Sequence, residues 1–290
     1  MKKIIIMSLF LALVGCQKAT VQVEKPVFTL DTYPVVDGST VTIPFSEALM
    51  ADLTSKTIEE VRPYVLHNKT HEAYVNLING SADIIFVTSP SAEELQLATT
   101  AGVEMEVIPI VSEAFVFITH KDNPVNNLTI EQIQKIYTGE ISNWKDVGGA
   151  DVAIRPFQRP VNSGSQTGFL DLVMKTVVPM VAPTELVSGG MGELIEAIAT
   201  YKNQADAIGY TYYYYVTDMW TNTNVKLLNV NGVYPNPTTI ANGKYPIHTS
   251  YYAVIRKTEA VDSDVRKMIA YILSDAGQTL AEGAGYVKVD

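Results

Sequence analysis

The residues best suited to chemistry form one stretch, Gln158–Gly168, in which an arginine precedes a run of small hydroxyl residues and glycines. Arg159 supplies a planar, permanently charged fork that matches a pair of oxygen atoms. Ser163 is a suitable N-cap, and the backbone N–H groups of the three residues after it would then have no partner inside a helix. Unpaired N–H groups beside a guanidinium predict a site for a small oxyanion.

An ordinary capped helix next to a surface arginine is the alternative interpretation of this stretch, because such caps are common. The residues after it, Phe169–Lys175, have the apolar spacing of a short amphipathic helix, and Pro179 would end it. The stretch therefore needs support from elsewhere in the chain before it is taken as a binding site.

Patterns typical of enzymes do not accompany the loop. No G-x-S-x-G motif surrounds Ser163 or Ser165, and the chain has no G-x-x-x-x-G-K-[ST] motif. The 4 histidines lack the spacing of metal ligands. A serine becomes a nucleophile only beside a positioned base, and the sequence does not indicate one. We therefore expect a binding protein rather than an enzyme, with neither a metal nor an organic cofactor.

The N-terminus is typical of a secretion signal. Two lysines precede the apolar run Ile4–Val14, which is too short to span a bilayer and fits the core of a signal peptide. The run ends at Gly15-Cys16, which resembles the lipobox of bacterial lipoproteins, where the cysteine is lipid-modified. We expect a signal peptide at 1–15, a lipid anchor on Cys16 and a tether over 16–30. A plain signal peptide with a chance cysteine is the alternative.

Size and charge limit the possible partners of the protein and the number of its domains. The full chain has 290 residues and a net charge of -10. Removal of Lys2 and Lys3 with the signal would make the charge about -12. An acidic protein is a poor partner for nucleic acid. About 270 residues exceed the usual size of one core, so two domains are expected.

Apolar runs alternate with helical patterns and predict an α/β fold, with ligands outside the carboxyl ends of the strands. The segments 107–111 and 114–118 have the composition of two strands, and 264–280 that of one late helix. Thr129 could cap a helix that ends at Gly139, and Gly80 could end an earlier one. Further along, the glycines of 188–192 precede a helical pattern and could border a ligand site or pack on a strand.

Two separated motifs carry a resemblance to a known family. The run Leu128–Gly149, with its Asn143-Trp144 and Gly148-Gly149, precedes the Arg159–Thr167 loop, and Ala207–Tyr210 and Gly285–Val287 follow. In this order they resemble the phosphate-binding lipoproteins of the bacterial high-affinity phosphate ABC importer. The resemblance implies a two-domain periplasmic-binding-protein fold of type II, with two crossovers and a ligand cleft between the domains. It also implies domain I at 31–111 with 248–290, and domain II at 112–247.

The resemblance assigns ligand-binding roles to particular residues. Arg159, Ser163, Gly164 and Ser165 match the phosphate loop of the second domain. On the first-domain side, Thr42 and Ile43 resemble the family's first phosphate loop, and Thr70 lies within 68–71, at the place of its second loop. Ser39, Thr40 and Thr88 are further candidate ligand residues on this side.

Two departures from the family pattern concern selectivity. Thr88-Ser89 stand where the family usually has an aspartate that accepts the proton of hydrogen phosphate, and Val161 stands where some members have an acid. Asp37 is a possible substitute as proton acceptor, and Glu72 is another. The alternatives are a turn hydrogen bond for Asp37 and a capping or solvent-facing role for Glu72.

The expected function is therefore capture of inorganic phosphate and its delivery to an ABC transporter permease, at the outer face of the cell membrane. Receptors for sulfate, molybdate or tungstate, and a phosphate-sensing or adhesive surface lipoprotein, are the alternatives.

Overall fold

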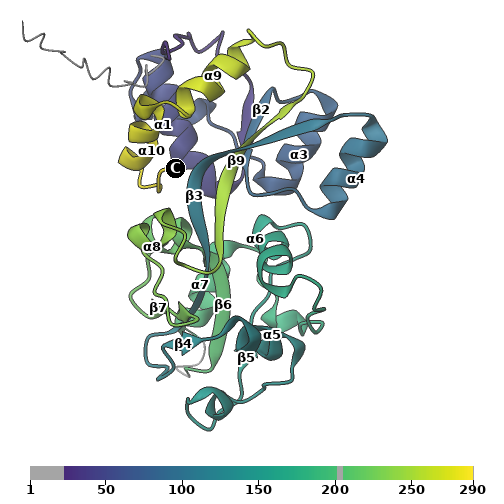
Figure 1. Cartoon of the computed structure of the whole chain (residues 1–290), viewed down its shortest axis with the longest axis vertical. Coiled ribbons are helices and arrows are strands. Elements are labelled where there is room, and N and C mark those ends of the chain that lie inside the picture. Colours follow the sequence, from purple (N-terminus) through teal and green to yellow (C-terminus); the bar gives the residue numbers. More distant parts are fainter. Residues whose placement is uncertain (1–22, 201–204, 290) are drawn as a thin grey trace, which may run out of the picture.

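The computed structural model describes residues 23–200 and 205–289, which form two lobes joined at a narrow waist (Figure 1). Two long strands, β3 (Met105–His120) and β9 (His248–Arg256), run through the waist. The chain thus has the two-domain periplasmic-binding-protein fold that was expected, with a mixed α/β composition and a crossing in each direction.

The first lobe combines the N-terminal part of the chain with its C-terminal end. Its elements are β1 (Val36–Gly38), η1 (Thr40–Thr42), α1 (Ile43–Thr54), α2 (Ile58–Val61), η2 (Arg62–Tyr64), α3 (Lys69–Asn79), β2 (Ile84–Val87), α4 (Ala92–Ala101), β9, α9 (Asp264–Ile272) and α10 (Asp275–Gly283).

The second lobe is formed by the middle of the chain. Its elements after β3 are β4 (Asn127–Leu128), α5 (Ile130–Thr138), η3 (Trp144–Val147), β5 (Arg155–Pro156), α6 (Gly164–Gly168), η4 (Phe169–Met174), η5 (Thr184–Leu186), α7 (Met191–Thr200), β6 (Ala207–Tyr212), η7 (Tyr215–Met219), β7 (Val225–Leu227), β8 (Asn229–Val230) and α8 (Pro237–Ala241).

A continuous path of strand pairing links the lobes, in the order β1-β2-β9-β3-β6-β5. β1 pairs with β2 in parallel, and β9 lies between β2 and β3, antiparallel to both. β3 pairs with β9 as far as Ala114 and with β6 from Phe115 onward. This change of partner lies close to the expected domain boundary at 111/112, which stays a prediction.

The two strands expected at 107–111 and 114–118 are one strand, and that expectation was wrong. β3 bends at an irregularity between Pro109 and Val111 but continues to His120. Ser112 and Glu113 are polar but buried, and no glycine or proline follows them to form a turn. Because these two residues are polar, the sequence pattern wrongly indicated a turn between two strands.

Local signals set the ends of several helices as expected. Thr129 caps α5 and, with Gln132, forms a capping box. Gly139 and Gly80 adopt positive φ values after α5 and α3, which glycine tolerates at a helix end. The single helix expected at 264–280 is divided into α9 and α10, because Ser274 accepts a hydrogen bond from the N–H of Gly277 and caps a new helix.

A buried acid lies where β3 leaves the first lobe. Glu113 is 2% exposed, and its Oε1 accepts hydrogen bonds from the N–H groups of Ala114 (2.8 Å) and Tyr214 (3.4 Å). Burial raises the pKa of the Glu113 carboxyl to about 7, although these N–H donors favour the charged form. Burial raises the pKa of five tyrosines, and the negative charge of Glu113 raises each of these pKa values further. They are Tyr212, Tyr213, Tyr214, Tyr251 and Tyr286.

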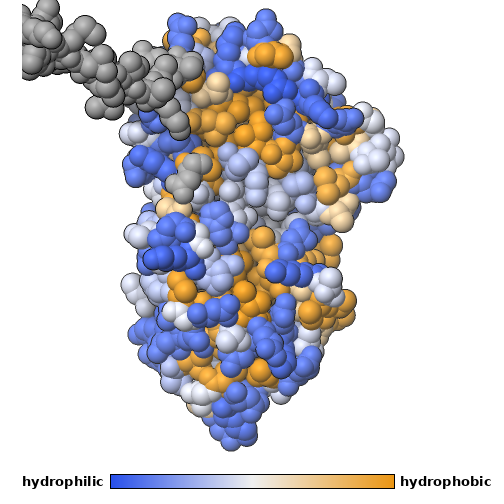
Figure 2. Space-filling view, in the orientation of Figure 1, coloured by the Kyte–Doolittle hydropathy of each residue, from blue (hydrophilic) through white to orange (hydrophobic). Residues whose placement is uncertain are grey.

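Hydrophilic residues cover most of the face shown in Figure 2, and hydrophobic residues gather on parts of each lobe. Within residues 23–200 and 205–289, no helix has the length and apolar character needed to cross a bilayer. The expected signal segment and Cys16 lie outside the described residues.

Candidate functional site

A cleft of about 770 Å³ separates the lobes and is lined from both of them. The residues of the candidate set that line it are Ser39, Thr40, Thr70, Thr88, Arg159, Ser163, Gly164 and Ser165. Segments 71 to 126 residues apart in the chain thus bring hydroxyl groups, one glycine and one guanidinium to the same space.

The second-lobe loop is built as its sequence indicates. Ser163 has an extended conformation, and its hydroxyl accepts a hydrogen bond from the N–H of Gln166 at 3.2 Å. The chain enters this cap through Asn162 at a φ of 68°, a conformation that asparagine tolerates better than most residues. The helical turns of α6 continue directly into η4, a π-helical segment, where the sequence predicted an α-helix.

Arg159 is oriented by groups of its own lobe. Its Nε donates to the carbonyl oxygen of Ser188 at 2.8 Å, and its Nη2 donates to that of Gly189 at 3.0 Å. Nη1 lies 3.4 Å from the Ser165 hydroxyl oxygen. These acceptors are neutral, so the hydrogen bonds fix the guanidinium without neutralising its charge. Burial lowers the pKa of Arg159, because the charged form loses hydration.

Two buried polar side chains, Gln166 and Tyr210, bind the backbone N–H of Arg159. Its N–H lies 3.0 Å from both the Gln166 Oε1 and the Tyr210 hydroxyl oxygen, and the Tyr210 hydroxyl itself donates to Gln166. Tyr210 in turn stacks on Phe169, with ring centroids 4.5 Å apart. The position of the guanidinium is therefore determined by the core of the second lobe.

The first lobe contributes two threonines at neighbouring element ends. Thr70 is the second residue of α3, and Thr88 directly follows β2. The carbonyl oxygen of Thr88 accepts a hydrogen bond from the Tyr74 hydroxyl at 2.8 Å. The Thr88 hydroxyl is buried and has no hydrogen-bond partner among the described residues. Leaving a buried hydroxyl without a hydrogen bond costs free energy, and a hydrogen bond to a ligand oxygen would remove that cost.

Gly164 is the point at which the lobes meet at the cleft. A Cβ atom on this residue would lie 2.5 Å from the Thr88 Oγ1 and 2.6 Å from the Thr70 Oγ1. Both distances are shorter than real Cβ contacts, so only glycine permits this approach. The two lobes are therefore in contact at this position.

Substituting Gly164→Ala is expected to prevent this approach and weaken ligand binding. Overpacking typically costs about 1–3 kcal/mol, which corresponds to roughly a 5- to 150-fold rise in Kd. Calorimetric titration with phosphate measures the effect. Gly283→Ala is the matched control, because a Cβ there meets nothing within 4 Å. An unchanged Kd for the Gly164 variant would show that closure does not require this contact.

Thr42 and Ile43 do not line the cleft, although both were candidate ligand residues. The Thr42 hydroxyl donates to the carbonyl oxygens of Phe86 (2.7 Å) and Ser39 (3.0 Å), so it serves the junction between η1 and β2. Ile43 begins α1. The polar residues that reach the cleft from this segment are Ser39 and Thr40.

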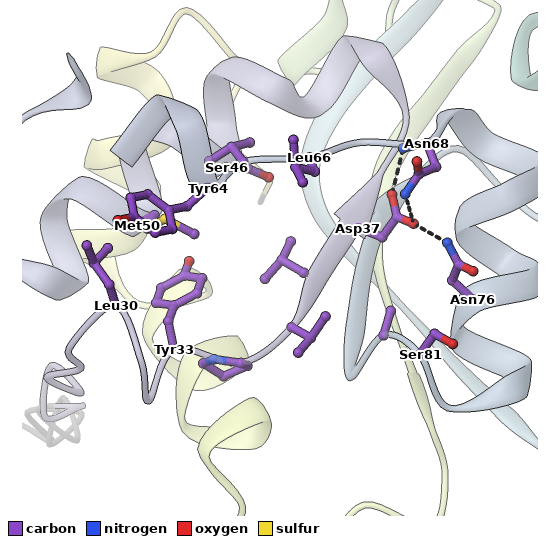
Figure 3. Close-up of a pocket in the computed structure, with 15 residues that line it drawn as sticks. Leu30, Tyr33, Asp37, Ser46, Met50, Tyr64, Leu66, Asn68, Asn76 and Ser81 are labelled. Atoms are coloured by element: carbon purple, nitrogen blue, oxygen red, sulfur yellow. Dashed lines mark hydrogen bonds between the residues drawn. The ribbon is translucent and has the colours of Figure 1, made fainter. Parts of the chain in front are cut away.

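Asp37, the candidate proton acceptor, faces a different cavity (Figure 3). Its carboxylate accepts four hydrogen bonds, from the N–H groups of Gly38 and Asn68 and from the side-chain amides of Asn68 and Asn76. All distances are between 2.6 and 2.9 Å. Four donors satisfy a carboxylate, so Asp37 fixes the start of α3 instead of receiving a proton from a ligand in the cleft.

Two carboxylates line the cleft, namely Glu72, which was the other candidate proton acceptor, and Glu193, which was not a candidate. His71 also lines it, with its Nδ1 3.2 Å from the buried Glu94 carboxylate. Met191, Tyr215 and Trp220 form an apolar part of the wall. The glycines of 188–192 signalled this region, but nothing in the local sequence placed the tryptophan next to them.

Comparisons with known proteins agree with this geometry. A family model described as a PBP superfamily domain matches residues 29–276. The phosphate-binding protein PstS of Borreliella burgdorferi is 27% identical over 217 residues, which cover 73% of this chain and 76% of that protein. PstS of Bacillus subtilis is 30% identical over 169 residues, which cover 58% of this chain and 52% of that protein.

Solved structures give the same result. A putative phosphate ABC transporter substrate-binding protein from Clostridium perfringens, determined with bound phosphate, is 28% identical with a TM-score of 0.68. The match covers 88% of this chain and 98% of that one. An ABC-type phosphate transport receptor from Vibrio cholerae shares the fold with a TM-score of 0.65 at 23% identity.

Proposed function

The chain belongs to the PBP superfamily, and from this membership we propose that it is an extracytoplasmic receptor for inorganic phosphate. The receptor captures the anion in the cleft between its lobes and delivers it to an ABC importer. The names of the relatives, which are phosphate-binding proteins, support phosphate as the ligand.

One observation carries the proposal, namely the convergence of Arg159 with hydroxyl groups from both lobes around one cleft. Among the described residues, the hydrogen bonds of the Arg159 guanidinium go to neutral acceptors, so its charge attracts an anion. Ser163, Ser165, Thr70 and Thr88 supply hydroxyl donors from opposite sides. A tetrahedral oxyanion has oxygens in all directions, and it suits a site whose donors come from two lobes.

The mechanism follows from the two crossings. The anion enters between the lobes, and a hinge motion at β3 and β9 brings Gly164 against Thr70 and Thr88. Closure excludes water and strengthens each charge-assisted hydrogen bond. A membrane permease would recognise the closed form, because only that form presents both lobes in a fixed relation.

Titration calorimetry of the purified protein with phosphate, sulfate, molybdate and tungstate tests the proposal. We expect phosphate to bind most tightly. The carboxylates that line the cleft, Glu72 and Glu193, can accept the proton of hydrogen phosphate, and sulfate has no such proton. Preference for sulfate, molybdate or tungstate would replace phosphate with another tetrahedral oxyanion. Absence of binding to all four would leave an adhesive surface lipoprotein.

A binding role rather than an enzymatic one fits the superfamily, whose members bind substrates. Within the described part of the chain, the Ser163 hydroxyl bonds to the N–H of Gln166 and the Ser165 hydroxyl to the Arg159 guanidinium, and neither partner is a base. We therefore assign these serines to ligand binding and not to catalysis.

The proposed location is the outer face of the cell membrane, with a lipid anchor on Cys16. The Gly15-Cys16 sequence after the apolar run supports this anchor. Cys16→Ser is expected to release the protein from membranes or leave it unprocessed, because the acyl chains would have no attachment point. Labelling with a radioactive fatty acid measures the modification. A wild-type protein that takes up no label would contradict the anchor.

A further inference from the structure

The cleft is much larger than an inorganic oxyanion requires. Its volume of about 770 Å³ lies within the range of roughly 300–1,000 Å³ that buries organic ligands of drug size. Phosphate has five heavy atoms and would occupy only the part next to Arg159 and Ser163. The rest of the cleft therefore has room for a group attached to the oxyanion.

The lobes are in contact at one point of this cleft. Gly164 approaches the hydroxyls of Thr70 and Thr88 so closely that a methyl group would not fit. The cleft extends beyond this contact to Met191, Tyr215 and Trp220.

An apolar wall continues from the anion-binding end. Trp220 packs on Gly192, where a Cβ atom would lie 3.0 Å from the indole ring. The Trp220 Nε1 donates to Glu196 at 3.1 Å, which fixes the ring while 44% of the residue stays exposed. A large aromatic ring that is held in place but left in water is a ready surface for an apolar group.

The apolar wall and Arg159 are joined by one short segment. The Arg159 Nη2 donates to the carbonyl oxygen of Gly189, and Trp220 packs on Gly192, three residues later. Tyr215 lines the same cleft. Burial raises the pKa of Tyr215, and the charge of Arg159 opposes that shift. A ligand whose oxyanion pairs with Arg159 can thus place a neighbouring group against Tyr215 and Trp220.

The charges near the wall limit what that group can be. Glu72 and Glu193 line the same cleft and are exposed, and the Glu193 Oε2 accepts the N–H of Gly190 at 2.9 Å. A second anionic group would meet these carboxylates and be repelled. An uncharged alkyl or aryl group would meet Met191, Tyr215 and Trp220 instead.

We propose that the cleft also takes organic phosphonates and phosphate monoesters, with the oxyanion at Arg159 and an uncharged apolar group against Trp220. This inference rests on the proposed oxyanion-binding function and extends it from inorganic phosphate to its organic derivatives.

Calorimetric titrations with inorganic phosphate, methylphosphonate and phenylphosphonate test the inference. Wild-type protein is expected to bind phenylphosphonate more tightly than methylphosphonate, because only the phenyl group reaches Trp220. Trp220→Ala should weaken phenylphosphonate binding by about 2- to 10-fold, the range for a lost aromatic pair. It should leave the Kd for inorganic phosphate unchanged, and Trp220→Phe should retain most of the preference.

Tyr234→Ala is the matched control, because Tyr234 is a similarly exposed aromatic residue that does not line the cleft. Binding of inorganic phosphate without any binding of phenylphosphonate would overturn the inference and leave the proposed function intact. An equal loss of all three ligands in Trp220→Ala would assign the ring a structural role and also overturn it. Failure of wild-type protein to bind any of the three would overturn both proposals.

Discussion

Arg159→Ala is expected to raise the Kd for phosphate by about 1.5 to 3.5 decades. Truncating one member of a buried, hydrogen-bonded charge pair costs roughly 2–5 kcal/mol, and each 1.4 kcal/mol is about a factor of ten in affinity. Arg159→Lys should recover only part of the loss, because an ammonium group lacks the planar fork. It would also leave the carbonyls of Ser188 and Gly189 with a differently shaped donor. Titration calorimetry of the three proteins measures the order.

Arg62→Ala is the control for net charge, because Arg62 is exposed, pairs with Glu47 and lies outside the cleft. It should bind phosphate as the wild type does. Ser163→Ala should cost less than Arg159→Ala, about 0.5–3 kcal/mol for one hydrogen bond. That variant also loses the cap of α6, so its melting temperature must be compared. Wild-type affinity in Arg159→Ala would exclude the loop as the ligand site.

Stability is expected to fall as the pH rises from 4.5 to 7, with Glu113 as the cause. Its pKa is raised by burial from 4.5 to about 7. Between these values the unfolded chain loses its proton while the folded protein keeps one, so the free energy of unfolding decreases with pH. The contribution is fully present below pH 4.5 and is lost above pH 7. A shift of this size corresponds to about 3 kcal/mol.

Glu113→Gln should remove this slope, because the amide is neutral at every pH and keeps an oxygen for the N–H of Ala114. Urea denaturation at several pH values between 4.5 and 8 measures the difference between variant and wild type. Glu185→Gln, at an exposed position, controls for the lost charge. A variant that keeps the wild-type slope would assign the pH dependence to other groups.

The local structure of the Arg159–Ser165 loop was predictable to a large extent from the sequence. Arg159 and the Ser163–Ser165 run are close together in the chain, and their geometry follows from one cap and one turn. Local rules also gave the helix ends at Gly80 and Gly139. Each of these features depends on interactions within a few residues, which a sequence pattern contains.

Features that depend on distant contacts were not predictable in the same way. Thr42 belongs to a motif that matches the family, but its hydroxyl is used by the carbonyl of Phe86, 44 residues away. Asp37 was a candidate because it is acidic and precedes Ser39, which lines the cleft, by two residues in the chain. The amides of Asn68 and Asn76 that satisfy it could not be assigned before the packing of α3 on β1 was known.

The apolar wall was missed for the same reason. Trp220 directly follows η7, and its position on Gly192 is a contact with α7, 28 residues earlier in the chain. The division of β3 into two expected strands had a different cause, since Ser112 and Glu113 are polar residues that the fold buries. Periodicity alone cannot distinguish a buried polar residue from a turn.

The place of β9 between β2 and β3 has a consequence for how the chain folds. Val87 of β2 pairs with Tyr252, and Val107 of β3 pairs with Val254, so both strands must wait for a partner synthesised 147 to 165 residues later. Until then, β2 and β3 present unpaired edges, which are prone to wrong pairing with other chains. Contacts of such long sequence separation also slow folding. The second lobe, whose strands β5 and β6 lie closer in the chain, can therefore assemble before the first lobe is complete.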